Sequence, residues 1–263
     1  MHEKRPQPAE DHETAHGARR RFDAVLCDID GCLAPETTAP LDLRALAEVA
    51  RWNDRAQAEG DRPVVTLCTG RPQPFAEAVC RVIGNRTLPI VCEMGVWLWF
   101  AGSNRYERDP RITDEDQRAV DEASRWVERE LGATGVVQQP GKTSSMSLYH
   151  EDTAYLMSLK PRLVETFARE GWKLRVSSTV RWINCDLAHV SKATGIDRLM
   201  QAAGLRAERL AGIGDTMGDL AIRERVAWFG CPSNAEAGLK AQADAVARGA
   251  EAMGVLELLE RIG

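Results

Sequence analysis

Several features that would place a chain in a special class are missing from these 263 residues. No apolar run approaches the roughly 20 residues that a membrane-spanning helix requires, so we expect no membrane partner. Residues 1–20 are polar and lack the apolar stretch of a signal peptide, which predicts a disordered tail. The seven cysteines form no CxxC pair and are odd in number, a pattern that favours the reducing cytoplasm over a disulfide framework.

The chain also lacks a strong excess of charge. A net charge of −5 offers no broad basic surface, so we expect no nucleic-acid partner. Hydrophobic residues make up 44% and charged residues 28%, which is typical of a globular protein. A chain of this length suits one large domain or two modest ones, and we expect a monomer or a homodimer.

The most informative segment is the apolar run of residues 22–27, which ends in Asp28, Ile29, Asp30 and a glycine. Side chains two apart on a strand share a face, so Asp28 and Asp30 are predicted to emerge together at the carboxyl end of a strand. Like charges this close repel and raise each other's pKa. A metal site or a pair of nucleophile and acid would explain them, and a helix cap or turn is the alternative.

Three later segments have related features. A second apolar strand, residues 64–68, is followed by Thr69, Gly70 and Arg71. Lys192 stands at the entry to a predicted helix, and a third strand, residues 210–214, is followed by Asp215 and Asp219. Taken singly, these residues also fit turn hydroxyls, solvated helix positions and helix N-terminal charges.

The flanking cysteines offer another nucleophile. Cys27 and Cys32 lie on either side of the two aspartates. A cysteine nucleophile needs a lowered pKa or a base, and no histidine is placed to activate either thiol. We therefore favour the carboxylates.

The first part of the chain alternates strands with helices. Helices are predicted at 41–59 and 74–83, and a third strand at 88–92. This alternation predicts a parallel sheet with crossover helices, in which ligands bind beyond the carboxyl ends of the strands.

From residue 97 the pattern changes to locally packed elements, which suggests an inserted α+β module. We predict helices at 113–131 and 154–169, a strand at 144–150, and a hairpin of 172–176 with 180–186. After it come a helix at 192–203, strands at 210–214 and 226–230, and helices at 234–242 and 255–262. The predicted domains are therefore a core of 21–96 with 188–263 and an inserted cap of 97–187.

In this order, DxDG, Thr-Gly, Lys and GDxxxD resemble the haloacid dehalogenase superfamily, which consists mostly of phosphatases. The long insertion between Thr69 and Lys192 is similar to the sugar-phosphatase branch. The resemblance implies an α/β fold with a Rossmann-like parallel-sheet core domain and an inserted α+β cap domain.

The resemblance also implies roles for the residues that match. Asp28 would attack phosphorus and form an aspartyl-phosphate, and Asp30 would protonate the leaving oxygen and later activate water. Mg²⁺ would be bound by Asp28, by the backbone carbonyl of Asp30 and by Asp215, with Asp219 in support. The phosphate oxygens would contact Lys192, Thr69 and Gly70.

One residue departs from the family pattern. The branch often has asparagine immediately before the last aspartate, where this chain has Gly218. Substrate specificity would come mainly from the cap. In the core, Arg71 is the candidate for contact with the substrate. The cap candidates are Lys142, Arg175, Arg181, Trp182 and Asn184, with Arg181 and Asn184 preferred.

These observations favour a cytoplasmic, magnesium-dependent phosphatase that acts on a small phosphorylated metabolite, such as a sugar phosphate or phosphoglycolate. A phosphomutase of the same superfamily is an alternative, because it would use the same four motifs. A non-catalytic regulatory domain that binds a phosphorylated ligand is another. A receiver domain, which also uses an aspartate with lysine and Mg²⁺, is about half this length and has no inserted cap.

Overall fold

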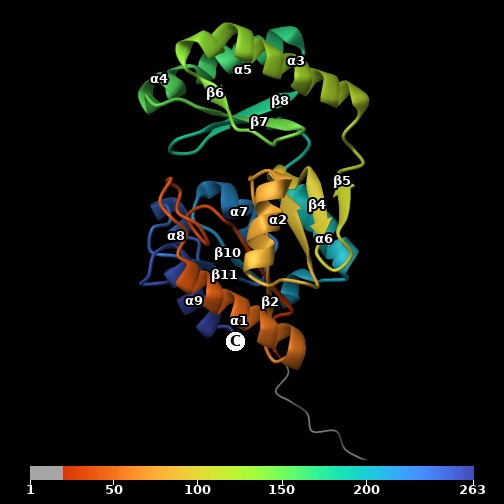
Figure 1. Ribbon diagram of the computed structural model, residues 1–263, viewed down its shortest axis with the longest axis vertical. Coiled ribbons are helices and arrows are strands. Elements are labelled where there is room, and N and C mark those ends of the chain that lie inside the picture. Colours follow the sequence, from red (N-terminus) through yellow and green to blue (C-terminus); the bar gives the residue numbers. More distant parts are fainter. Residues whose placement is uncertain (1–19) are drawn as a thin grey trace, which may run out of the picture.

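The computed structural model describes residues 20–263, so the tail predicted for residues 1–20 lies outside the described residues except for Arg20. Two layered units are stacked along the long axis of the molecule (Figure 1). The lower unit contains a parallel sheet between helices, and the upper unit contains an antiparallel sheet beneath helices. No helix of residues 20–263 combines the length and the apolar character needed to cross a membrane.

The lower unit is built on a five-stranded parallel sheet with the order β12-β11-β10-β1-β2. The strands β1, β2 and β10 are buried throughout, and β11 is buried except at Trp228, as expected for a sheet covered on both faces. This confirms the predicted parallel-sheet core. The strands are β1 (Ala24–Cys27), β2 (Val64–Leu67), β10 (Leu210–Ile213), β11 (Trp228–Cys231) and β12 (Ala245–Val246).

A second, antiparallel sheet belongs to the same unit. It contains β3 (Pro89–Cys92), β4 (Trp97–Phe100) and β5 (Arg105–Arg108), and a parallel bridge between Cys68 and Val91 joins it to the end of β2. We predicted that the insertion begins at residue 97, but β4 and β5 stay with β3. The reason is the apolar run of β4, which buries Leu98 and Trp99 in the hydrophobic clusters of the lower unit.

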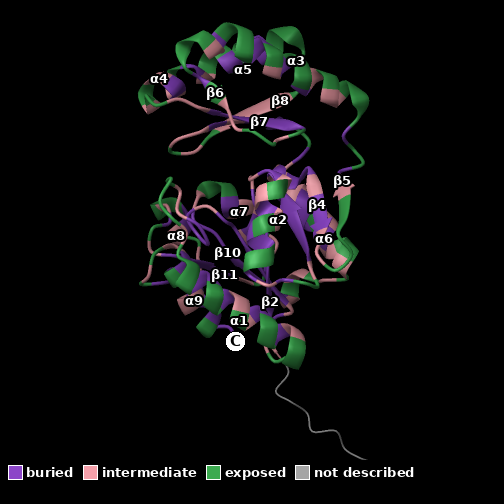
Figure 2. Ribbon diagram, in the orientation of Figure 1, coloured by how far each residue is buried: buried purple, intermediate pink, exposed green. Residues whose placement is uncertain are grey.

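Helices cover the main sheet and expose one face to solvent (Figure 2). In α1, the Asp42 side chain accepts the first free N–H groups and Gly60 ends the helix at a φ of 66°. The predicted closing helix at 234–242 is reduced to four residues. The helices are α1 (Leu43–Glu59), α2 (Gln73–Val82), α6 (Lys192–Ala203), α7 (Leu220–Arg223), α8 (Ala237–Lys240) and α9 (Glu251–Glu260).

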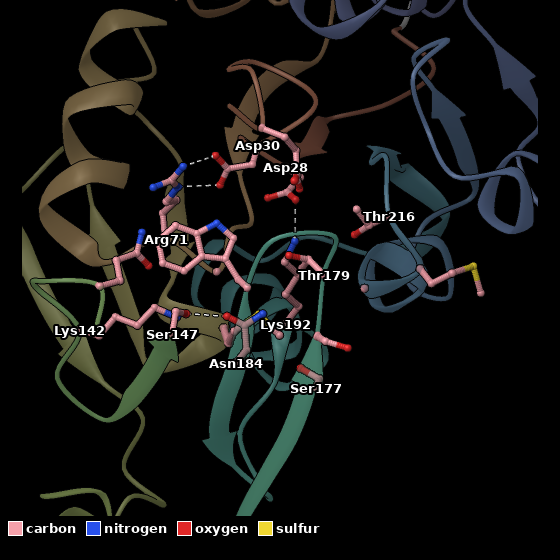
Figure 3. A pocket seen from close by; sticks show the side chains of 18 of the residues that line it. Asp28, Asp30, Arg71, Lys142, Ser147, Ser177, Thr179, Asn184, Lys192 and Thr216 are labelled. Carbon is pink, nitrogen blue, oxygen red and sulfur yellow. Dashed lines mark hydrogen bonds and ion pairs between the residues drawn. The ribbon is translucent and has the colours of Figure 1, made fainter. Parts of the chain in front are cut away.

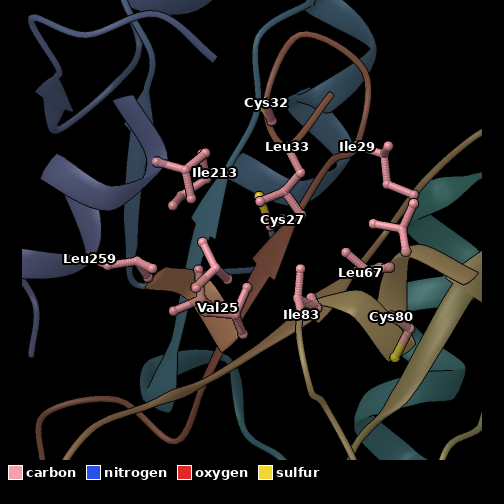
Figure 4. Close-up of a cluster of buried hydrophobic side chains, with 14 of the residues drawn as sticks. Val25, Cys27, Ile29, Cys32, Leu33, Leu67, Cys80, Ile83, Ile213 and Leu259 are labelled. Carbon is pink, nitrogen blue, oxygen red and sulfur yellow. The ribbon is translucent and has the colours of Figure 1, made fainter. Parts of the chain in front are cut away.

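Short 3-10 turns connect several of these elements: η1 (Glu93–Gly95), η2 (Gly132–Thr134), η3 (Ala207–Arg209) and η4 (Met217–Asp219). Two of them, η1 and η4, follow strands at the cleft between the units. Beneath the cleft, an apolar cluster fixes β1 between its neighbours (Figure 4). Val25, Cys27, Leu67 and Ile213 are all fully buried in it, so the strand ends that carry the acidic residues sit on a rigid base.

The upper unit has an antiparallel sheet with the order β6-β7-β9-β8. Met146, Leu148, Ile183 and Cys185 turn to the helices and form one apolar cluster with them. The alternate residues of the strands are polar and face the lower unit. The elements are β6 (Val137–Gln138), β7 (Ser145–Tyr149), β8 (Leu174–Ser178), β9 (Ile183–Leu187), α3 (Asp114–Leu131), α4 (Thr153–Ser158) and α5 (Lys160–Glu170).

Two predicted elements of the upper unit differ from the structure. The helix predicted at 154–169 is interrupted, because Pro161 has no N–H to donate and begins a new helix, α5. The predicted hairpin turn at 177–179 lies further along, where the Thr179 N–H bonds to the Trp182 carbonyl at 3.0 Å. Ser177 and Ser178 therefore belong to β8, beside the cleft.

Candidate active site

A cavity of about 320 Å³ lies between the carboxyl ends of the core strands and the polar face of the upper sheet (Figure 3). This is the position at which open α/β sheets bind ligands. From the lower unit it is lined by Asp28, Asp30, Glu36, Gly70, Arg71, Met94, Lys192, Thr216, Met217, Gly218 and Glu236. From the upper unit it is lined by Gln139, Lys142, Ser147, Ser177, Ser178, Thr179, Trp182 and Asn184.

Lys192 joins two of the predicted aspartates at the floor of the cavity. Its Nζ lies 2.9 Å from Asp28 Oδ2 and 2.7 Å from Asp219 Oδ1, and all three residues are buried. The other oxygen of Asp28 accepts the N–H of Ile29 at 2.8 Å. These three contacts fix the Asp28 carboxylate and the ammonium group in one geometry, with the carboxylate at the cavity wall.

Burial makes the charges of this cluster costly. It raises the pKa of Asp28 to about 7, against the opposing charge of Lys192. It also raises the pKa of Asp215 to about 9, and the charges of Asp28 and Asp219 add to the effect. Burial disfavours the Lys192 ammonium, yet Asp219 and Asp28 together raise the pKa of Lys192 well above its usual value. The carboxylates of Asp28 and Asp215 therefore have too little positive charge nearby to offset the cost of their burial.

Asp30 is held by a different cation. The Arg71 guanidinium donates from Nε and Nη2 to the two oxygens of Asp30, at 2.7 and 2.6 Å. Arg71 in turn stacks on Phe75, with 4.8 Å between the guanidinium carbon and the ring centroid. Asp28 and Asp30 therefore line the same cavity, as predicted. Each carboxylate is paired with a different cation, Asp28 with Lys192 and Asp30 with Arg71.

The strand end of β2 supplies the turn beside them. The Thr69 hydroxyl is buried and accepts the backbone N–H of Arg71 at 3.1 Å, so it shapes the turn. Gly70 lines the cavity. A phosphate-binding role for Thr69 and Gly70 stays a prediction. The backbone of the turn lies at the cavity, where it could contact a phosphate group.

Comparison with known sequences finds a family and a relative that this chain resembles. A family model of haloacid dehalogenase-like hydrolases matches residues 143–259. A phosphoglycolate phosphatase from Natronomonas pharaonis is 25% identical over 236 residues, which are 89% of this chain and 95% of that protein. These comparisons support the resemblance of the chain to hydrolases of the haloacid dehalogenase superfamily.

Solved structures share the fold of this chain. A haloacid dehalogenase-like hydrolase from Bacteroides thetaiotaomicron matches with a TM-score of 0.69 and 17% identity, over 92% of this chain and all of that one. A sucrose-phosphatase from Synechocystis, in complex with sucrose and phosphate, matches with a TM-score of 0.65 and 15% identity, over 92% and 98%. Both cover the two units together, which confirms the predicted core with a cap.

The site contains an acidic cluster that fits a divalent cation. One oxygen from each of Asp28, Asp215 and Asp219 lies within 4.8 Å of the others, all on buried residues. Asp215 Oδ1 is buried without a hydrogen-bond partner, as a vacant ligand atom would be. Asp219 differs, because Lys192 and the N–H groups of Asp215 and Thr216 already occupy its oxygens. Carboxylate oxygens are the ligands that Mg²⁺ prefers.

Gly31 is required for this cluster. Its φ is 70°, and a Cβ atom placed on it would lie 1.9 Å from Asp215 Oδ2. The glycine of the DxDG sequence therefore lets the first strand end approach the third. Gly218, where the family branch often has asparagine, lines the cavity and offers only backbone groups.

The structure divides the predicted substrate residues of the cap. Lys142, Trp182 and Asn184 line the cavity. Arg175 instead donates to the carbonyl oxygens of Ala188 and Val190. Arg181 is not among the lining residues, although its charge lowers the pKa of Glu36 against the effect of burial.

Sequence reasoning missed several polar lining residues, namely Gln139, Ser147, Ser177 and Thr179. The alternation of serine with apolar residues in Ser145–Tyr149 was a usable signal for Ser147, because it marks one polar face of a strand. The hydroxyl of Ser147 lies 2.5 Å from the side-chain oxygen of Asn184 on the neighbouring strand. Polar groups from β7, β8 and β9 thus form the ceiling of the cavity.

Glu93 is a further residue without a predicted role. It is fully buried, has a φ of 48°, and accepts four hydrogen bonds from the start of the β7 segment. Its Oε1 accepts the N–H groups of Thr143 and Ser144, each at 2.7 Å, and the hydroxyl of Ser145 at 3.0 Å. Its Oε2 accepts the Thr143 hydroxyl at 3.0 Å. The carboxylate therefore fastens the cap to the core beside the cavity.

Proposed function

We propose that this protein is a magnesium-dependent phosphatase that hydrolyses a small phosphorylated metabolite through an aspartyl-phosphate on Asp28. The observation that supports it most strongly is the Asp28 carboxylate at the cavity wall, held 2.9 Å from Lys192. A fixed carboxylate beside an ammonium group can attack phosphorus while the cation balances the charge of the phosphate oxygens.

In the first step, an oxygen of Asp28 forms a bond to phosphorus as the bond from phosphorus to the alcohol oxygen breaks. Asp30 gives its proton to the departing alkoxide. In the second step, water attacks phosphorus, Asp30 takes the proton, and the bond to Asp28 breaks to release phosphate. Arg71 fixes the orientation of the Asp30 carboxyl group in the cavity through two hydrogen bonds, for both steps.

Asp28 and Asp215 would hold the metal, and Asp219 would orient Lys192 and the turn that carries Asp215. When bound, Mg²⁺ supplies positive charge between the carboxylates and the phosphoryl group. The raised pKa values of Asp28 and Asp215 support this assignment, since both groups reach the ionised state more easily beside a cation.

The size of the cavity supports a small substrate. Its volume of about 320 Å³ is near the lower end of the roughly 300–1,000 Å³ typical of small-molecule sites. Sugar phosphates and phosphoglycolate are the proposed substrates, in keeping with the relative and the neighbour that bear such names. The seven cysteines are all free, which supports the proposed cytoplasmic location.

The decisive experiment is a phosphate-release screen over phosphorylated metabolites with Mg²⁺, using the wild type and Asp28→Asn. We expect release by the wild type alone. A phosphomutase would convert the substrate into an isomeric phosphate ester without free phosphate, and a regulatory domain would bind the ester unchanged. Release by Asp28→Asn at the wild-type rate would contradict the proposed nucleophile.

A further inference from the structure

Three cationic side chains line the cavity, and they differ in their partners. Arg71 is paired with Asp30, and Lys192 with Asp28 and Asp219. The third, Lys142, has no hydrogen bond and no carboxylate oxygen within 4.0 Å of its ammonium group among residues 20–263. An unpaired ammonium group beside a cavity is available to a ligand.

Two acidic residues, Asp186 and Glu93, act on the charge of Lys142, but neither forms an ion pair with its ammonium group. The oxygens of Glu93 are occupied by the hydrogen bonds from residues 143–145. Asp186 is buried with both oxygens lacking hydrogen bonds, and Arg175 is its ion-pair partner at 3.7 Å. Burial lowers the pKa of Lys142, and the charges of Asp186 and Glu93 oppose this. An anion arriving in the cavity would therefore gain a direct partner.

The position of Lys142 is fixed by the backbone that follows it. The next two N–H groups, of Thr143 and Ser144, both bond to buried Glu93. In Figure 3, Lys142 extends toward Ser147 and Asn184, while Asp28 and Asp30 lie across the cavity from it. If the phosphoryl group sits against Asp28 and Lys192, the part of the substrate that reaches Lys142 is the leaving alcohol.

We propose that Lys142 is a specificity-determining residue that binds a carboxylate on the leaving alcohol. This inference rests on the proposed phosphatase function. The substrate class is then a phosphorylated hydroxy acid rather than a neutral sugar phosphate, because a neutral leaving group would leave the ammonium group in the cavity without an ionic partner. The hydroxyl and amide groups beside it, of Ser147 and Asn184, suit the remaining polar atoms of such an acid.

The test uses three two-carbon phosphomonoesters that differ only in their terminal group: 2-phosphoglycolate, ethylene glycol monophosphate and phosphoethanolamine. We expect wild-type kcat/KM to favour the carboxylate over the neutral ester by about tenfold or more. Lys142→Gln should bring that ratio close to one, and Lys142→Arg should retain most of it. Lys173→Gln removes the same charge from an exposed position of the cap and should keep the wild-type ratio.

A binding measurement separates this inference from the phosphatase proposal. In Asp28→Asn protein, 2-phosphoglycolate should raise the melting temperature more than the neutral ester does, and adding Lys142→Gln should remove the difference. Phosphate release without a preference for the carboxylate, or a preference that persists in Lys142→Gln, would overturn the role of Lys142 and leave the phosphatase standing. No release from these esters or from p-nitrophenyl phosphate would overturn the phosphatase proposal itself.

Discussion

The guanidinium group of Arg71 donates from Nε and Nη2 to the two oxygens of the Asp30 carboxylate, at 2.7 and 2.6 Å. This pairing joins the ends of two neighbouring strands, β1 and β2, and places the proposed acid within the cavity. A two-point contact of this kind fixes the orientation of a carboxylate as well as its charge.

We expect Arg71→Met to reduce kcat/KM on alkyl phosphates by about tenfold to a hundredfold, because Asp30 loses its orientation and general acid catalysis is worth about 10²–10⁴. The loss should be much smaller on p-nitrophenyl phosphate, whose leaving group needs no proton. Arg71→Lys should fall between, since lysine makes no two-point contact. Equal losses on both substrates would show that Arg71 acts on something other than proton transfer.

Replacement of the proposed nucleophile should separate activity from folding. Asp28→Asn should lower phosphate release by at least about 10³-fold, since the amide cannot form the aspartyl-phosphate. The melting temperature should stay close to that of the wild type, because the buried carboxylate that is lost is itself costly to ionise. A variant that melts normally and turns over normally would refute the assignment of Asp28.

Stability should depend on pH in the direction set by the acidic cluster. The pKa values of Asp28 and Asp215 are raised to about 7 and about 9 in the fold, so both bind protons more tightly there than in the unfolded chain. Their contribution is fully present below the ordinary carboxyl pKa and is lost as the pH rises through these values. The melting temperature of metal-free protein should therefore fall as the pH rises from about 4 to about 9.

Mg²⁺ should offset that loss. Ionised carboxylates bind the metal and protonated ones do not, so added Mg²⁺ should raise the melting temperature more at pH 8.5 than at pH 5.5. Chelation with EDTA should abolish phosphate release, and Mg²⁺ should restore it. Asp215→Asn should remove most of the thermal effect. An equal shift at both pH values, or one that survives in Asp215→Asn, would argue against a metal site at this cluster.

Glu93 gives a prediction about the junction of the two units. In Glu93→Ala, the part-buried N–H group of Thr143 and the buried N–H group of Ser144 lose their acceptor, and a buried group left unsatisfied costs about 1–3 kcal/mol. The urea midpoint should fall by a corresponding amount, and Glu93→Gln should recover part of it because the amide oxygen still accepts. A midpoint unchanged in Glu93→Ala would mean that water replaces the carboxylate at no cost.

The acidic residues of the site could be located from the sequence because their positions depend on local order. Apolar runs of four or five residues predicted buried strands, and the residues after each run had to lie at the same edge of a parallel sheet. For the same reason, most helices of the core were placed within a few residues. The errors fell where a single residue overrides periodicity, as Pro161 does, or where an apolar run such as that of β4 fits either unit.

Tertiary structure alone decided how the charges pair. Asp30 meets Arg71 across 41 residues of sequence, and Glu93 meets Thr143 across 50, and no local pattern specifies either contact. The state of Lys142 is decided in the same way, since an ammonium group is paired or unpaired according to how two separate units pack around it. The sequence by itself thus determined that the acidic groups at the strand ends reach the cleft, because strand periodicity is local. The fold decided which of them are already neutralised, because ion pairing depends on distances between segments far apart in the chain.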